Sequence, residues 1–413
     1  MTLAERGGRR ASLYPGLGDA LDIFRVREYF EAITEVRDIA RRVREDAGFV
    51  NTLRRALFKL PTDAGPSPAA RSLWPPLLQP IRLRHIRVAI VATGGSGALA
   101  SLVGVLRACQ EQGIRPHAMS FASGAALFAF PIAAGKTPDE VAEFALGLDP
   151  TDWVDPNWRG LAGILPSGGR GFAGIIKGSK LEKTYSGFLG GIRLGELKIP
   201  AYAPVWNIEH NRIEYIGPRT HPEMKVAHAI RMSISLPLFV DPVRWRGGHW
   251  CDGGIVDIFP VHPVLDIEQP PDAVLAVNCF YPPGFEGEDA TGWQEHPWSV
   301  LDIADQVVTA QHVQLARENM RRLRAEVPTV MMMEPVPYEL VRRTGFYAQF
   351  LERRDWSAFM RSGRRDAARL LKKLPQAHVA SPRQRARGRK ATAISSVSGA
   401  TTSGHEMRIE SAG

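Results

Sequence analysis

Residues 88–135 read VAIVATGGSGALASLVGVLRACQEQGIRPHAMSFASGAALFAFPIAAG, and they are the part of the chain that indicates the fold class most clearly. Short apolar runs alternate with glycine-containing turns and with longer apolar segments of helical length. The stretch therefore predicts a strand, a glycine-rich turn, a helix, a second strand, a sharp turn and a second helix, at residues 88–92, 94–97, 99–112, 117–122, 123 and 124–134. This order is typical of the opening of a parallel α/β sheet with right-handed crossovers.

The rest of the chain extends this pattern on both sides. Apolar periodicity predicts a helical N-terminal region over residues 18–60 and a Pro/Ser-rich linker over 61–80. Residues 150–195, rich in Gly, Trp and Phe, are interpreted as a covering segment. Further strands are predicted at 201–208, 213–216, 273–280 and 329–333, and further helices at 222–233, from 299 to 323, and in a last stretch that ends near 374.

The predicted fold class is α/β: a three-layer α/β/α domain with a mostly parallel central sheet, an N-terminal helical extension and a disordered C-terminal tail. We expect three parts, namely a helical region and linker at 1–85, the α/β domain at 86–374, and a basic tail at 375–413. The tail is rich in Ser, Thr, Gly and Arg and poor in apolar residues, which is why we expect disorder there.

Composition bounds the class of protein. The chain has 413 residues, of which 44% are apolar and 23% are charged, which is ordinary for a globular protein that buries a full core. Its net charge of +9 is concentrated in the Arg-rich first 60 residues and in a basic cluster at 383–390. A basic tail with solvated helix faces explains this charge, and attraction to an anionic lipid surface remains an alternative. Because no nucleic-acid motif accompanies the charge, we expect no nucleic-acid partner.

Three further observations bear on the cellular location. Three cysteines, Cys109, Cys251 and Cys279, have no metal-ligand spacing and indicate a reducing compartment. The chain opens with polar residues rather than with the apolar segment of a signal peptide. Two uncharged stretches, 88–106 and 118–135, are interrupted by glycines and are interpreted as buried α/β elements rather than membrane spans. We expect a cytoplasmic protein, with peripheral contact with a membrane left open.

One serine lies in a position suited to nucleophilic chemistry. Ser123 falls at the predicted sharp turn between a strand and a helix, where a hydroxyl can be presented to a substrate. The earlier turn, residues 94–97, precedes a helix and offers backbone N–H groups to a negative charge. A dinucleotide-binding loop has a similar appearance, but it needs an acidic residue at the end of the second strand, and residues 119–122 contain none.

Four segments in order resemble the patatin-like phospholipase family. They are GGSGAL at 94–99 with the helix that follows, the segment 114–135 around Ser123, AIRMSISLP at 229–237, and DGGIVD at 252–257. The resemblance covers roughly residues 86–280. It implies a lipid acyl ester hydrolase with Ser123 as nucleophile and Asp252, in the motif Asp252-Gly253-Gly254, as its base. An aspartate is ordinarily ionised at neutral pH, and burial would make it a stronger base.

The resemblance also implies an oxyanion hole at Gly94, Gly95, Ser96 and Gly97, and it has departures. The family's nucleophile motif is GxSxG, whereas residues 121–125 read FASGA and lack both glycines. A shift of one residue would place Ala122 at the nucleophile position and leave a dead site; the flanking segments favour Ser123. Ala98 and Leu99 replace a basic residue and a glycine in the oxyanion loop, which predicts slow turnover.

Other residues are weaker candidates. His249 and His262 lie near Asp252 in the sequence and would offer a Ser-His-Asp triad, although such histidines are more often structural. Asp257 is interpreted as support for the loop after the base, and residues 331–333 as a buried strand. Trp153, Trp158 and Phe172 with the glycines of 168–171 are either a mobile lid over an acyl chain or ordinary core.

The sequence therefore predicts an enzyme that hydrolyses lipid esters such as a phospholipid, lysophospholipid or acylglycerol, with no cofactor and no metal. The rival interpretation is a catalytically impaired lipid-binding or scaffolding protein that keeps the fold. It rests on the bulky Phe121 and on the altered oxyanion loop.

Overall fold

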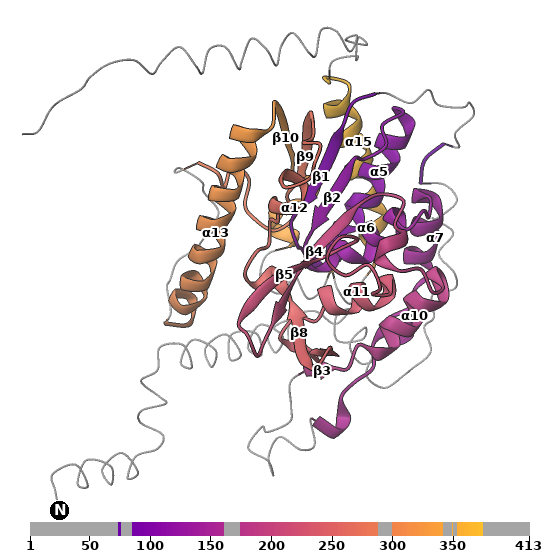
Figure 1. Ribbon diagram of the computed structural model, residues 1–413, viewed down its shortest axis with the longest axis vertical. Coiled ribbons are helices and arrows are strands. Elements are labelled where there is room, and N and C mark those ends of the chain that lie inside the picture. The colour runs from indigo at the N-terminus through magenta and orange to yellow at the C-terminus, as the bar shows by residue number, and fades with distance from the viewer. Residues whose placement is uncertain are drawn as a thin grey trace, which may run out of the picture. The chain divides into compact units, whose positions relative to one another are not determined.

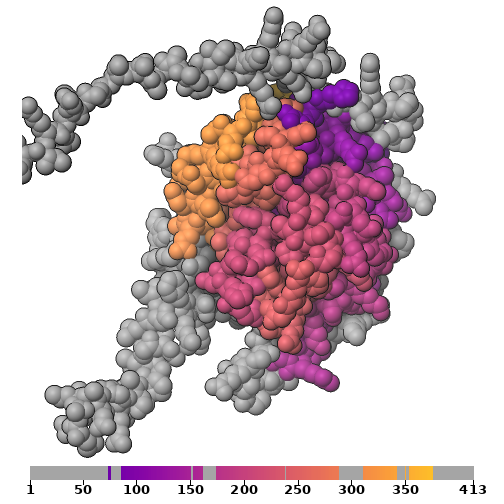
Figure 2. Space-filling view, in the orientation of Figure 1, coloured from indigo at the N-terminus to yellow at the C-terminus, as the bar shows by residue number. Residues whose placement is uncertain are grey.

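The computed structural model describes residues 73–75, 85–160, 174–287, 300–341, 349 and 353–374. The helix predicted over 18–60, the tail from 375 onward, and the segment 168–172 of the predicted lid lie outside the described residues, as does most of the predicted linker. The α/β unit is shown as a ribbon in Figure 1 and as a space-filling view in Figure 2.

A mixed eight-stranded sheet forms the centre of this unit, with most of its strands parallel. Five strands run parallel in the order β10 (Thr329–Met333), β9 (Ala273–Val277), β1 (Val88–Ala92), β2 (Ala118–Phe121) and β4 (Ala201–Asn207). Three antiparallel strands complete the sheet. Strands β5 (Arg212–Ile216) and β8 (Gly248–Asp252) pair with β4, and β7 (Val243–Trp245) pairs with β8. Every residue of β1 and β9 is buried, as expected where helices cover both faces of a parallel sheet.

Helices cover both faces, so the predicted three-layer α/β/α architecture is confirmed (Figure 1). On one face, apolar residues of α13 (Val300–Glu326) and α12 (His262–Leu265) pack against alternate strand residues such as Ala89, Val91 and Ala276. The other face carries α5 (Ser101–Glu111), α6 (Ala126–Ala133), α7 (Pro138–Gly147) and α15 (Trp356–Leu371). Alternation along each strand assigns its side chains to the two layers.

Helices α5 and α15 cross at close range through glycines. A methyl group on Gly104 would lie 1.8 Å from the Met360 carbonyl oxygen, and one on Gly363 would lie 2.1 Å from that of Ser101. Any larger side chain would push the helices apart. The crossing holds α15 against the turn that precedes α5, which belongs to the candidate site.

Most of the predicted elements are confirmed, and two regions differ. The predicted covering segment contains a short helix α8 (Pro150–Trp153), a strand β3 (Gly174–Ile176) and a regular helix α10 (Ser179–Leu189), whereas α11 begins later than predicted (Val226–Ser233). Strands β6 (Leu238–Val240), β7 and β8 were not predicted. The turn between β7 and β8 has positive φ at both Arg246 (47°) and Gly247 (83°), as in a two-residue hairpin.

Among the described residues, no helix combines the length and apolar character needed to cross a membrane.

Candidate active site

Ser123 lies at the sharp turn that follows β2. Ala122 is extended (φ −112°, ψ 156°), and Ser123 then takes a positive φ of 53° before the short turn η3 (Ser123–Ala125) leads into α6. Positive φ is unfavourable for a residue with a side chain, and such strain is concentrated at functional sites. The residue with nucleophile-elbow geometry is therefore Ser123 rather than Ala122, which favours the unshifted alignment.

Phe121 does not occupy the space beside Ser123. It is the last residue of β2, is 1% exposed, and its ring makes an edge-to-face contact with Phe130 of α6, with the ring centroids 4.8 Å apart. Adjacent side chains of a strand point to opposite faces, so Phe121 enters the core between the sheet and α6, whereas Ala122 belongs to the opposite layer. The position of Phe121 therefore gives no support to the rival interpretation of a catalytically impaired protein.

Gly124 allows the turn after Ser123 to touch the glycine-rich loop. A methyl group on Gly124 would lie 2.5 Å from the carbonyl oxygen of Ser96 and 2.7 Å from its Cα. On the other side of the turn, a methyl group on Gly94 would lie 3.1 Å from Cβ of Ser123. The two turns identified in the sequence are therefore packed directly on each other.

This contact gives a stability prediction. Gly124→Ala is expected to destabilise the protein by about 1–3 kcal/mol, the usual cost of forcing extra volume into a packed site. Gly187→Ala is the matched control, because this glycine lies in α10 with nothing within 4 Å of the added methyl group. It should be neutral or stabilising by up to about 1 kcal/mol. Thermal unfolding of both variants decides the point, and equal effects would contradict the close packing.

Asp252 lies at the end of β8, a strand that runs in the direction opposite to β2. One edge of β4 pairs with β5, and the other pairs first with β2, at Ala201 and Tyr202, and then with β8, at Val205 to Asn207. Strand β8 runs antiparallel to β4, so the carboxyl ends of β2 and β8 face each other along that edge. The two residues do not come from neighbouring parallel strands: β4 bridges them.

The DGG sequence fits this position residue by residue. The Asp252 carboxylate accepts a hydrogen bond from the N–H of Gly254 (2.8 Å) and so caps the short turn η5 (Gly253–Ile255). A methyl group on Gly253 would lie 2.5 Å from the backbone of Pro204 and Val205, so the chain can pass over β4 only without a side chain there.

Burial raises the pKa of Asp252 from 3.8 to about 7, and hydrogen bonds from the Ser123 side chain and the Gly254 N–H oppose that rise. The carboxyl group is 1% exposed and Ser123 is 6% exposed. Asp252 therefore differs from an ordinary aspartate, because its low-dielectric surroundings disfavour the charged form of its carboxyl group. A carboxylate of this kind is a stronger base once ionised.

The glycine-rich loop presents backbone donors beside Ser123. Gly95 has φ 144° and Ser96 has φ 57°, and in the described part of the chain the N–H groups of Gly95, Ser96 and Gly97 donate to no acceptor. Gly94 differs from its expected role, because its N–H already donates to the Ile258 carbonyl (3.1 Å).

The turn after Ser123 offers one more donor, which the sequence interpretation missed. Gly124 is the second residue of the turn η3, and its N–H group has no hydrogen-bond partner within that turn. The available signal was its place directly after the proposed nucleophile, where hydrolases of this general kind supply one oxyanion donor.

The substituted loop residues are packed rather than displaced. Ala98 and Leu99 are 0% exposed within η2 (Ser96–Ala100), which leads into α5. A methyl group on Gly97 would lie 1.9 Å from the carbonyl oxygen of Gln349 and 2.3 Å from the indole nitrogen of Trp356, so α15 supports the loop from behind. The loop is therefore closely packed, although Ala98 and Leu99 stand at the positions of the basic residue and the glycine.

The remaining candidates lie outside this centre. Asp257 accepts hydrogen bonds from the Tyr215 hydroxyl (2.6 Å) and from the Asn319 amide (3.1 Å), which ties the loop after Asp252 to β5 and α13. His249 pairs with Glu209, and His262 contacts Arg322, so neither completes a triad with Asp252.

The two described tryptophans of the predicted lid differ in their exposure to solvent. Trp153 is 7% exposed and belongs to the core, whereas Trp158 is 49% exposed. Residues 331–333 belong to strand β10, as predicted, but of these three only Met333 is buried.

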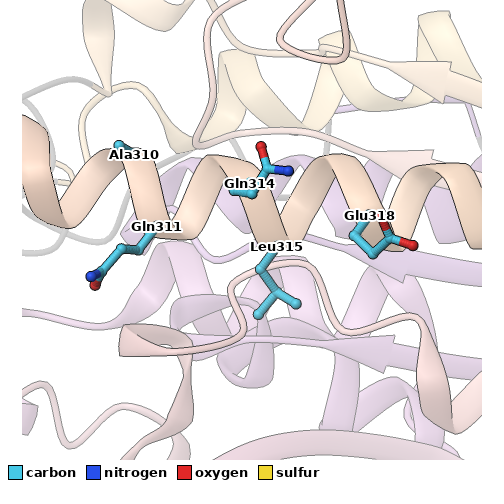
Figure 3. Close-up of a pocket in the computed structure, with 5 residues that line it drawn as sticks. All are labelled: Ala310, Gln311, Gln314, Leu315 and Glu318. Atoms are coloured by element: carbon cyan, nitrogen blue, oxygen red, sulfur yellow. The ribbon is translucent and has the colours of Figure 1, made fainter.

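Among the described residues, no group of three His, Cys, Asp or Glu side chains is placed to hold a metal ion. A hollow on the outer side of α13 is lined by residues of that helix alone, at Ala310, Gln311, Gln314, Leu315 and Glu318 (Figure 3). It contains neither Ser123 nor Asp252 and is distinct from the packed face of α13.

Similar solved structures include VipD from Legionella pneumophila (15% identity, 70% of this chain and 67% of that chain, TM-score 0.41). Human GIVD cytosolic phospholipase A2 with methyl gamma-linolenyl fluorophosphonate is another (11%, 81% and 62%, 0.37), as is the ExoU–SpcU complex of Pseudomonas aeruginosa (14%, 76% and 61%, 0.34). This chain thus spans about three fifths to two thirds of the length of these proteins.

A search of curated proteins found no relative similar enough in sequence to report. The family model described as Patatin-like phospholipase matches residues 90–265, an interval that holds the glycine-rich loop, Ser123 and Asp252. This chain therefore carries a domain of the patatin-like phospholipase family.

Proposed function

We propose that this protein is a lipid acyl ester hydrolase in which Ser123 is the nucleophile and Asp252 its general base. The family assignment supports a lipid hydrolase at the level of the family. One arrangement carries the finer proposal: a strained serine at the end of β2 lies near a buried aspartate at the end of β8, close enough for the serine side chain to lower the pKa of that carboxyl group. A nucleophile held by its base is the minimum requirement for this chemistry.

The proposed reaction has two steps. In the first, Ser123 Oγ attacks the ester carbonyl carbon while its proton passes to the Asp252 carboxylate, and the tetrahedral oxyanion is held by backbone N–H groups. Collapse breaks the ester C–O bond, and the proton on Asp252 goes to the departing alkoxide. In the second step water attacks the acyl-Ser123 ester, gives its proton to Asp252, and Ser123 leaves with that proton as the acid is released.

The N–H groups of Gly95, Ser96, Gly97 and Gly124, which donate to no acceptor among the described residues, are the proposed oxyanion donors. The loop and the turn that carry them pack on each other at Gly124. Backbone donors do not depend on the side chains at positions 98 and 99, so the departures from the family motif leave them in place. We expect a slow but functional enzyme, and we propose phospholipids, lysophospholipids or acylglycerols as the substrate class.

The ionisation of Asp252 predicts the pH dependence. Only the ionised carboxylate accepts the serine proton, and its pKa is raised to about 7 by burial. The rate is therefore expected to rise with pH through a midpoint near 7 and to level off above about 8. An unburied aspartate would instead give full activity from about pH 5 upward. The measurement is kcat/KM across pH 5–9 in buffers of constant ionic strength.

The function itself is tested by assaying the purified full chain against dispersed fluorogenic phospholipids, lysophospholipids and acylglycerols. Release of fatty acid from at least one class supports the proposal. Binding of these lipids without any release, with the protein folded, would favour the rival, a lipid-binding or scaffolding protein that has lost turnover.

A further inference from the structure

Both proposed catalytic residues are held by the same three-residue segment. The segment Ser233–Ser235 begins at the last residue of helix α11, and both serines are fully buried. The Ser233 hydroxyl donates to the backbone carbonyl of Ser123 (3.4 Å), and the Ser235 carbonyl accepts the backbone N–H of Asp252 (3.0 Å). A displacement of this segment would therefore move Ser123 and Asp252 relative to each other.

The guanidinium group of Arg231 binds this segment directly. Arg231 lies one helical turn before Ser235, and its guanidinium donates to the Ser235 hydroxyl, which in turn donates to the Arg231 carbonyl (2.7 Å). This closed pair of hydrogen bonds fixes the last turn of α11 at the point where the chain turns toward Asp252.

The same guanidinium reaches two other parts of the chain. It donates to the carbonyl of Lys177, just after β3, and to that of Asp241, just after β6 (2.6 Å). Gly178 has φ 73°, and a methyl group there would lie 2.2 Å from Nε of Arg231. Arg231 therefore joins three separate segments, and Gly178 leaves the room it needs.

Placing a cation here is costly. Arg231 is 4% exposed, and burial lowers its pKa, while the carboxylates of Glu182, Asp155 and Asp241 act in the opposite direction. A charge that serves only packing could be replaced by an apolar side chain, so a buried and multiply bonded one suggests a role in fixing geometry.

We propose that Arg231 is the positioning residue of the active site: it locks the Ser233–Ser235 segment so that Ser123 and Asp252 stay aligned. This inference rests on the proposed function for its catalytic consequence. Arg231 acts through Ser233 and Ser235, and no hydrogen bond joins it to Ser123 or Asp252 themselves. Lysine cannot replace it, because a single ammonium group lacks the planar fork that reaches several acceptors at once.

The test compares Arg231→Lys with Arg107→Lys. Arg107 is equally buried (1% exposed), and its guanidinium also bonds to three groups, those of Glu111, Asp139 and the Pro75 carbonyl, but none of them contacts Ser123 or Asp252. Both variants should lose thermal stability. Only Arg231→Lys should lower kcat, by about tenfold to 100-fold with KM little changed, as expected when reacting groups are misplaced by a fraction of an ångström to 1 Å.

Backbone hydrogen exchange supplies a readout that does not need activity. Arg231→Lys should speed exchange at the Asp252 amide, whose acceptor is Ser235, by about tenfold or more, and Arg107→Lys should not. Equal loss of kcat in both variants, or unchanged exchange at Asp252 in Arg231→Lys, would overturn the positioning role. Faster exchange at Asp252 in Arg231→Lys, combined with a wild-type protein that hydrolyses no ester, would support the positioning role and reject the proposed function alone.

Discussion

Ser123→Ala is expected to abolish ester hydrolysis, with kcat/KM falling by about 10⁴-fold to 10⁶-fold, as when other nucleophiles that form a covalent intermediate are removed. Without Oγ no acyl-enzyme forms, and backbone donors alone can only stabilise direct attack by water. Alanine tolerates the positive φ of 53° about as poorly as serine, so the fold should survive.

Ser120→Ala is the matched control for this loss. Ser120 is also fully buried, lies three residues away on β2, and its hydroxyl has no hydrogen-bond partner among the described residues. Removing that hydroxyl should leave kcat/KM within about threefold and stability unchanged or slightly higher, because no hydrogen bond is lost. A similar decline in both variants would mean that damage to β2, rather than loss of a nucleophile, explains the result.

Asp252→Asn is expected to lower kcat/KM by about 10²-fold to 10⁴-fold, the usual contribution of a general base. The same variant should be more stable than wild type at alkaline pH. The pKa of Asp252 is higher in the folded protein, about 7, than its ordinary value of 3.8, so the folded state retains a proton that the unfolded chain has released. Wild-type stability contributed by this group therefore falls as pH rises from about 4 to 7 and stays low above.

The magnitude follows from the same values. A rise in pKa from 3.8 to about 7 corresponds to about 4 kcal/mol of lost stability above pH 7. Asparagine carries no such penalty, so the advantage of Asp252→Asn should be largest near pH 8 and should vanish near pH 4. Chemical denaturation at the two pH values measures it, and a difference that does not change with pH would show that Asp252 is not strained by burial.

The sequence was sufficient for the α/β class, because apolar runs that alternate with glycine-containing turns are a local pattern. It also singled out Ser123 and Asp252 as candidates, through ordered segments that resemble the patatin-like phospholipase family. Strands β1 and β10 were predicted at their observed bounds because continuous apolar runs end abruptly there.

What the sequence could not predict depends on contacts between distant segments. The antiparallel pairing of β8 with β4 sets Asp252 against the end of β2, and no local pattern specifies that register. The direction in which the Phe121 ring points depends on Phe130 across the layer. The raised pKa of Asp252 and the engaged N–H of Gly94 likewise follow from three-dimensional surroundings.

The central claim is that Ser123 is an activated nucleophile, and covalent labelling by a fluorophosphonate tests it most directly. After reaction of the full chain with this serine-directed probe, peptide mass spectrometry should locate a single adduct on Ser123, formed faster above pH 7 and absent from Ser123→Ala. An unmodified Ser123 in folded protein, or an adduct on another serine, would contradict the account.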